Sequence, residues 1–234
     1  MTAGGRDACA LMAAGPVVHT PPMDSTPPRL LTVNVGEPRD VDLGDRVVRT
    51  AIWKSPVDGR VPVRGVNLDG DDQADRTVHG GPDKAVYAYA AEDTAWWSEH
   101  TGRELGPGAF GENLTTAGVD VSGALIGERW AIGDTLLEVR QSRMPCFKLG
   151  LRMDDPGFVR AFAQVDRPGA YLAIVREGDV GAGDTVEVVH RPAHGVTMAL
   201  MHRALLQDRT LLPSLLDAPE LMPEWRDWIL ERTA

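Results

Sequence analysis

The most informative stretch of the chain reads Arg140-Gln141-Ser142-Arg143-Met144-Pro145-Cys146-Phe147-Lys148-Leu149-Gly150-Leu151-Arg152. It holds four of the chain's 24 basic residues and none of its 34 acidic residues. Because Pro145 disfavours helical geometry in the residue before it, we expect Cys146 at the exit of the strand-like run 135–141. Basic neighbours favour a thiolate, which is both the nucleophile and the metal-ligating form of cysteine. A lone cysteine can equally be a small buried apolar residue, so both roles stay open.

Two glycine-containing segments precede this stretch. The first, His79-Gly80-Gly81-Pro82-Asp83-Lys84-Ala85, predicts a tight turn that presents a histidine on one side and a lysine on the other. Its glycines would let a ligand approach the backbone, whose N–H groups can hold an anion, although a plain loop explains it too. The second, Phe110-Gly111-Glu112-Asn113-Leu114-Thr115, follows Gly106-Pro107-Gly108 and predicts a loop. Glu112 and Asn113 would hydrogen-bond a polar heterocycle, or Asn113 would cap its own turn.

Around these motifs the chain is mainly β up to about residue 190. Runs of apolar and β-branched residues, broken by Gly, Pro and Asp, predict strands over 30–35, 47–53, 61–68, 85–89, 129–132, 135–141, 171–175 and 185–190. Helices are predicted over 92–100 and 158–165, and three more over 196–206, 211–216 and 223–232, with prolines at the breaks. A helical segment of this length buries little core alone, so we expect it to pack on another surface.

Composition limits the partners and the compartment. The chain has 234 residues and a net charge of −10, which argues against nucleic acid and anionic membrane surfaces as partners. No run approaches the roughly 18 apolar residues of a membrane span. The two cysteines, Cys9 and Cys146, form no disulfide framework and no C-x-x-C pair, which favours a reducing cytoplasm. Residues 1–28, rich in Ala, Gly and Pro, are predicted to be a flexible N-terminal extension.

The three motifs, in this order, resemble the signature of the MOSC domain family, named after the C-terminal domain of molybdenum-cofactor sulfurase. The resemblance covers residues 29–190, and residues 191–234 resemble the small three-helix domain that follows it in YiiM-type members. It implies a β-barrel-like domain with a few helices, followed by a three-helix bundle. Ser142 departs from the pattern, because a proline is expected there.

The resemblance also implies a function. Members are thought to bind the molybdenum cofactor (molybdopterin) or to carry sulfur, and in one branch a cysteine thiolate ligates molybdenum in a reductase of N-hydroxylated bases and related compounds. Cys146 occupies that position, and Lys84, Arg143 and Lys148 are candidates for the pterin phosphate. The remaining candidates are catalytic or substrate-contacting residues His79, Glu112 and Asn113, and cofactor-contacting glycines Gly80, Gly81 and Gly111. Electrons would come from an external reductase, and the expected role is detoxification.

Two other functions stay open. Cys146 would carry a persulfide delivered by a cysteine desulfurase if the protein is a sulfur carrier. In a binding module without chemistry, Trp225 and Trp228, three residues apart on one helical face, would recruit a partner. Alternatively, both tryptophans pack on the protein's own β domain or on a second copy in a homodimer.

Overall fold

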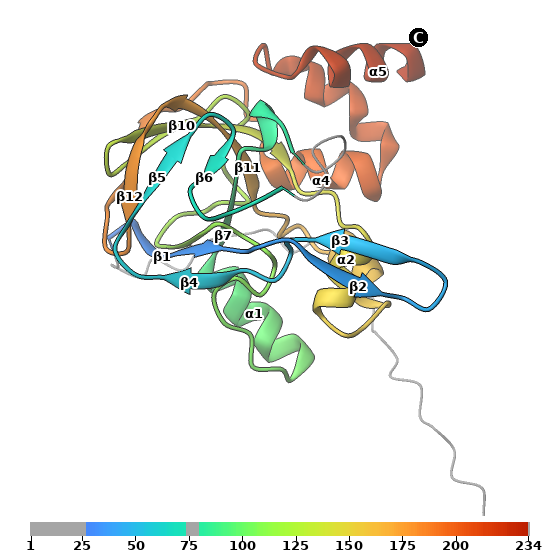
Figure 1. Ribbon diagram of the computed structural model, residues 1–234. Coiled ribbons are helices and arrows are strands. Elements are labelled where there is room, and N and C mark those ends of the chain that lie inside the picture. The colour runs from blue at the N-terminus through green and yellow to red at the C-terminus, as the bar shows by residue number, and fades with distance from the viewer. Residues whose placement is uncertain (1–26, 74–79, 234) are drawn as a thin grey trace, which may run out of the picture.

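The computed structural model describes residues 27–73 and 80–233 (Figure 1). Its main element is an eight-stranded sheet in the order β13-β9-β10-β11-β7-β8-β1-β4, in which only β7 and β8 pair in parallel. The strands are β1 (Arg29–Val35), β4 (Ser55–Val57), β7 (Val86–Ala90), β8 (Leu114–Ala117), β9 (Arg129–Ile132), β10 (Thr135–Ser142), β11 (Ala170–Arg176) and β13 (Val186–His190). The mainly β prediction is therefore confirmed.

The sheet is strongly curled (Figure 1), but no closed barrel is found among its described strands, so the barrel-like form stays a prediction. The two end strands, β4 and β13, do not pair with each other. Instead β4 occupies the second half of the outer edge of β1, pairing with Val33 to Val35. The first half of that edge meets the segment just before β13, where Leu30 N–H donates to the Asp184 carbonyl at 2.8 Å. We call this short contact the seam.

Two smaller sheets complete the β structure. One is a three-stranded sheet in the order β12-β5-β6, formed by β5 (Arg60–Arg64), β6 (Asn67–Leu68) and β12 (Gly178–Gly181). The other is the hairpin of β2 (Arg39–Asp42) and β3 (Val47–Thr50), which projects from the body in Figure 1. The strands β2, β4 and β12 were not predicted. The prediction that the second motif is a loop is also corrected, because its last residues, Leu114 and Thr115, begin β8.

Helices cover one end of the sheet. They are α1 (Ala91–Thr101), which ends at Gly102 in the left-handed conformation, α2 (Phe147–Arg152) and α3 (Phe158–Ala163). Their buried faces join β7 in an aromatic cluster that contains Tyr87, Tyr89, Trp97, Phe110, Phe158 and Phe162. The helices α1 and α3 match the predicted ranges closely, whereas α2 was not predicted.

The C-terminal segment folds back on the sheet. It consists of α4 (Met198–Leu206), the 3-10 helix η2 (Arg209–Asp217) and α5 (Pro223–Thr233). The three predicted helical ranges, 196–206, 211–216 and 223–232, correspond to these three helices, of which η2 is a 3-10 helix with Pro213 inside it; their description as a bundle stays a prediction. One hydrophobic cluster includes residues of this segment and of the sheet, and Trp225 and Trp228 pack against it. No described helix is long and apolar enough to span a membrane.

Candidate functional site

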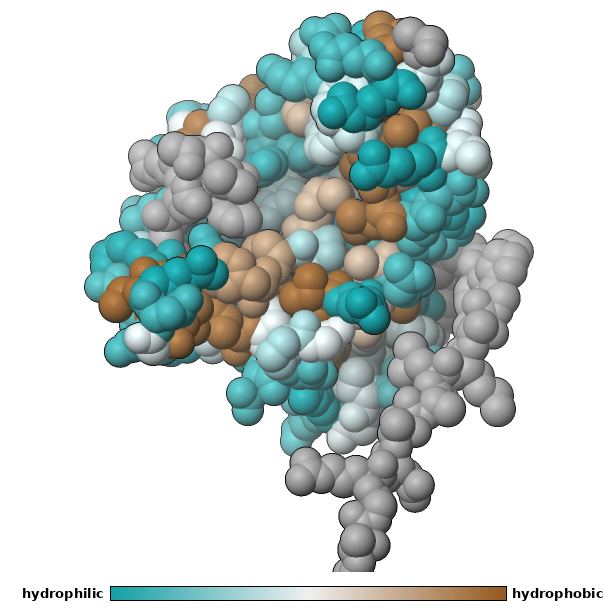
Figure 2. Space-filling view, turned by 90° about the vertical axis from the view of Figure 1, so that its right-hand side faces the viewer, coloured by the Kyte–Doolittle hydropathy of each residue, from teal (hydrophilic) through white to brown (hydrophobic). Residues whose placement is uncertain are grey.

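A pocket of about 100 Å³, partly open to solvent, lies where β7, β10 and α2 meet. Its lining includes Cys146 and four basic side chains, those of Lys54, Lys84, Arg143 and Lys148. Figure 2 shows the face of the molecule that carries the β2–β3 hairpin and the C-terminal helices; it is hollowed between them, and hydrophobic side chains gather around the hollow. Two acidic residues, Asp71 and Asp72, also line the pocket, so it combines one thiol with an excess of basic over acidic side chains.

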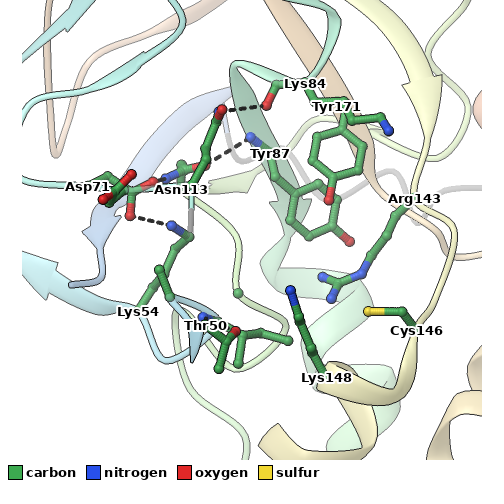
Figure 3. A pocket seen from close by; sticks show the side chains of 15 residues that line it. Thr50, Lys54, Asp71, Lys84, Tyr87, Asn113, Arg143, Cys146, Lys148 and Tyr171 are labelled. Atoms are coloured by element: carbon green, nitrogen blue, oxygen red, sulfur yellow. Dashed lines mark hydrogen bonds and ion pairs between the residues drawn. The ribbon is translucent and has the colours of Figure 1, made fainter. Parts of the chain in front are cut away.

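Cys146 stands at the junction of β10 and α2, as the position of Pro145 predicted. Its backbone is extended, with φ −131° and ψ 172°, and its carbonyl accepts the Leu149 N–H at 2.9 Å. The side chain is half-buried. Figure 3 shows its sulfur beside the guanidinium of Arg143 and the ammonium of Lys148, which come from the two sides of the junction. A thiolate here would face both cations on its pocket side.

Arg143 is fixed rather than mobile. It is 5% exposed, and its guanidinium donates to the Phe110 carbonyl of the second motif. Its planar group lies over the ring of Tyr87 at 4.9 Å and near that of Phe162 at 5.9 Å. Stacking on aromatic faces and a carbonyl partner hold an arginine in one orientation. The charge beside Cys146 is therefore preorganised.

A second polar group faces Cys146 across the pocket. Lys54 forms a buried ion pair with Asp71, and that carboxylate also accepts the Gly36 N–H at 2.8 Å and the Asn113 Nδ2–H at 2.9 Å. Burial lowers the pKa of Lys54, although the negative charge of Asp71 acts to raise it. Asn113 in turn accepts the Tyr87 N–H at 3.1 Å; Figure 3 draws this bond and the ion pair of Lys54 with Asp71. The network ties the wall of the pocket to β7.

Glu112 belongs to the loop rather than to the pocket lining. It is fully buried and accepts hydrogen bonds from Gly108 N–H at 2.6 Å, Phe110 N–H at 3.0 Å and the Thr115 hydroxyl at 2.9 Å. Burial raises its pKa although these three donors pull the other way. Gly111 does line the pocket; its φ is +73°, and a Cβ there would lie 2.9 Å from Ile52 Cγ1. Only glycine fits that position without strain.

The first motif forms the turn before the 3-10 helix η1 (Pro82–Lys84). Lys84 lines the pocket, and burial lowers its pKa. Gly81 has a φ of +100°, and its N–H donates to Gln73 Oε1 at 3.2 Å. Gly80 and Gly81 are not among the described lining residues, and His79 lies outside the described residues.

The structure thus brings six of the motif residues to one pocket: Lys84, Gly111, Asn113, Arg143, Cys146 and Lys148. Sequence reasoning missed Lys54 and Asp71, together with the tyrosines Tyr87 and Tyr171. Lys54 had one available signal, since it follows the apolar run Ala51-Ile52-Trp53 as a lone charge. Within the described ranges no group of three or more His, Cys, Asp or Glu side chains is arranged to hold a metal ion.

Fold and pocket define a mainly β protein whose pocket holds one thiol beside the basic side chains of Arg143 and Lys148. The family model of the MOSC domain matches residues 75–187. Uncharacterized protein YflK of Bacillus subtilis (strain 168) is 33% identical over 200 residues, which are 84% of this chain and 90% of that protein. A protein of Gibberella moniliformis named "Reductase" is 32% identical over 167 residues, which are 70% of this chain but 29% of that protein.

The fold is also found among solved structures. The crystal structure of YiiM from Geobacillus stearothermophilus is similar with a TM-score of 0.72 and 28% sequence identity, and the match covers 89% of this chain and all of that one. The chain belongs to the MOSC domain family and is of the YiiM type. Domains of this family are associated with the molybdenum cofactor.

Proposed function

We propose that this protein binds the molybdenum cofactor with the Cys146 thiolate as a ligand and reduces N-hydroxylated bases or related compounds. The observation that carries the proposal is the position of Cys146, half-buried in a pocket with Arg143 and Lys148 beside its sulfur. The fungal relative named as a reductase supports a redox role. Electrons would reach the pocket from an external reductase.

The side chains present fit the cofactor. Cys146 offers one soft thiolate, a suitable additional ligand for a metal already held by the dithiolene sulfurs of a pterin. Four basic residues line the pocket, and a phosphate group is the anion that such side chains bind with charge-assisted hydrogen bonds. When bound, the cofactor would supply the two-electron chemistry that converts an N–OH group to N–H with release of water.

The protein's own residues would orient this chemistry and supply protons. Arg143 and Lys148 would stabilise negative charge beside Cys146, as thiolate or as phosphate. Reduction of N–OH to N–H and water consumes two protons. Lys54 Nζ holds one in the pocket wall, and because burial lowers its pKa it releases that proton more readily than an ordinary lysine. Asp71 and Asn113 would keep Lys54 in place.

Metal analysis of protein purified from a host that makes the cofactor tests the proposal. We expect molybdenum equimolar with the chain, and its loss in Cys146→Ala, while Cys9→Ala retains it. Circular dichroism should show both variants folded. A wild-type protein without molybdenum would overturn the proposal.

The same preparation tests the second candidate, a sulfur carrier with a persulfide on Cys146. The half-buried sulfur at the pocket favours this candidate, because a desulfurase must reach it. A sulfane-sulfur signal that is lost in Cys146→Ala, in protein without molybdenum, would support it in place of the reductase.

A further inference from the structure

The C-terminal helix α5 forms a hydrogen bond to a buried amide side chain of the sheet. Gln141 of β10 is 3% exposed, and its Oε1 accepts the indole N–H of Trp225 at 3.4 Å. Its Nε2 lies 3.9 Å from the sulfur of Met222, in the turn before α5. A buried amide needs partners for its oxygen and its nitrogen, and here both sides of the amide reach the C-terminal segment.

The same amide reaches the pocket turn. Gln141 Nε2 donates to the backbone carbonyl of Asp83 in η1 at 3.4 Å. The Asp83 carboxylate is held separately by Arg140 Nε, at 2.7 Å. Two neighbouring residues of β10 therefore fix Asp83, one through its backbone and one through its side chain. The next residue in the chain is Lys84, which lines the pocket.

We infer that the C-terminal helices position the Lys84 turn of the pocket, through the contacts Trp225 to Gln141 and Gln141 to Asp83. Trp225 acts by fixing the oxygen end of the Gln141 amide, so that the nitrogen end points to the Asp83 carbonyl. Without the indole N–H, the amide oxygen would be buried without a partner and the amide would turn. The C-terminal segment is thus part of the pocket's support, and Trp225 and Gln141 are positioning residues. This inference concerns the geometry of the turn and does not require the proposed reaction.

Amide hydrogen exchange measured residue by residue tests it directly. The Lys84 N–H donates to the Gly81 carbonyl at 3.1 Å and reports the closure of the turn, and the Val139 N–H of β10 reports the stability of the sheet. In Trp225→Phe, which keeps an aromatic ring but removes the donor, we expect exchange at Lys84 to become about fivefold to tenfold faster relative to Val139. Gln141→Met removes both contacts at similar length and should show at least the same change.

Trp228→Phe is the matched control. Trp228 lies on the same helix, packs against Trp225 at 5.6 Å between ring centroids, and lies under Arg232 rather than beside Gln141. Its variant should leave the Lys84 to Val139 ratio within about twofold. Equal changes in both tryptophan variants, or no change in Trp225→Phe and Gln141→Met, would overturn the inference. If the wild type contains molybdenum, the molybdenum content of the same variants is a second readout: a loss in Trp225→Phe but not in Trp228→Phe supports the inference, whereas equal losses in both contradict it.

Discussion

Glu112 illustrates, at the scale of one residue, how a polar side chain beside a pocket can serve the protein's own backbone. The sequence places it between a pocket glycine and a pocket asparagine, and that position predicted contact with a ligand. In the structure its two oxygens accept two backbone N–H groups and a hydroxyl of the same loop. Such a carboxylate sets the shape of the loop that carries Gly111 and the Phe110 carbonyl, and the latter holds Arg143.

Glu112→Gln is expected to destabilise the fold. An amide has one acceptor oxygen in place of two, so one of the buried N–H groups of Gly108 and Phe110 loses its partner. The expected loss is about 1–3 kcal/mol in the free energy of unfolding, measured by urea denaturation. Glu92→Gln is the control, because its bond to Gly118 N–H lies at the surface. Equal small effects in both variants would contradict the structural role of Glu112.

The pocket residues show what sequence could and could not predict. Cys146, Arg143 and Lys148 lie within a few positions of one another, so the local excess of basic residues drew attention to them. Lys54 and Asp71 are each alone in sequence, and their pairing depends on the path of the chain from β3 through β4 to β6. No local pattern encodes such a pair.

At the scale of elements, α4 carries a buried histidine that packs against Phe162 of α3. His202 is 0% exposed; one ring nitrogen lies 3.3 Å from the Phe162 carbonyl, and Nδ1 has no described partner. The ring stands edge-on to Phe162, on which Arg143 also lies. Burial lowers the pKa of His202 below its ordinary value of 6.5. The helix therefore favours the neutral imidazole.

This lowered pKa predicts acid sensitivity. Below pH 6.5 the imidazole of His202 is protonated in the unfolded chain but still neutral in the folded protein. The free energy of unfolding therefore decreases as the pH is lowered from 6.5 to the lowered pKa of the folded state. His202→Gln does not titrate, and its amide can still donate to the Phe162 carbonyl. Urea denaturation at pH 7.5, 6.5 and 5.5 should show a smaller decline in this variant than in the wild type. Parallel declines would exclude His202 as the cause.

Elements were predictable where they are long and periodic. β10 and α1 have clear alternation or clear stop signals, and their predicted limits lie within one residue of those observed. β2, β4 and α2 have three to six residues, too few for a period to emerge. α2 ends at Arg152, and Asp154, two residues later, is in the left-handed conformation at φ +49°, where glycine is the usual residue. The sequence after α2 therefore lacks the glycine that usually indicates the end of a helix.

At the scale of the whole molecule, the larger of the two hydrophobic clusters spans the sheet and the C-terminal segment. It contains Trp130 and Ile132 of β9 as well as Met201 of α4 and Ile229 of α5. The segment also continues the backbone bonding of the body, since Met198 N–H donates to the Ala124 carbonyl at 2.9 Å. That residues 29–190 and 191–234 are two separate domains remains a prediction.

Calorimetry tests that independence. Because the cluster is shared, we expect residues 29–190 and 191–234 to unfold in a single transition, with equal calorimetric and van't Hoff enthalpies. Two separate transitions in the full chain would show instead that the C-terminal segment is an autonomous domain.

The seam has a consequence for how the chain comes to be folded on the ribosome. Leu30 bonds to Asp184, roughly 150 residues later, and loops of that length close slowly. During translation, the first half of the outer edge of β1 therefore has no hydrogen-bond partner until residue 184 has been synthesised. Chaperone binding to nascent chains should accordingly be strongest before residue 184 emerges and should decline after it.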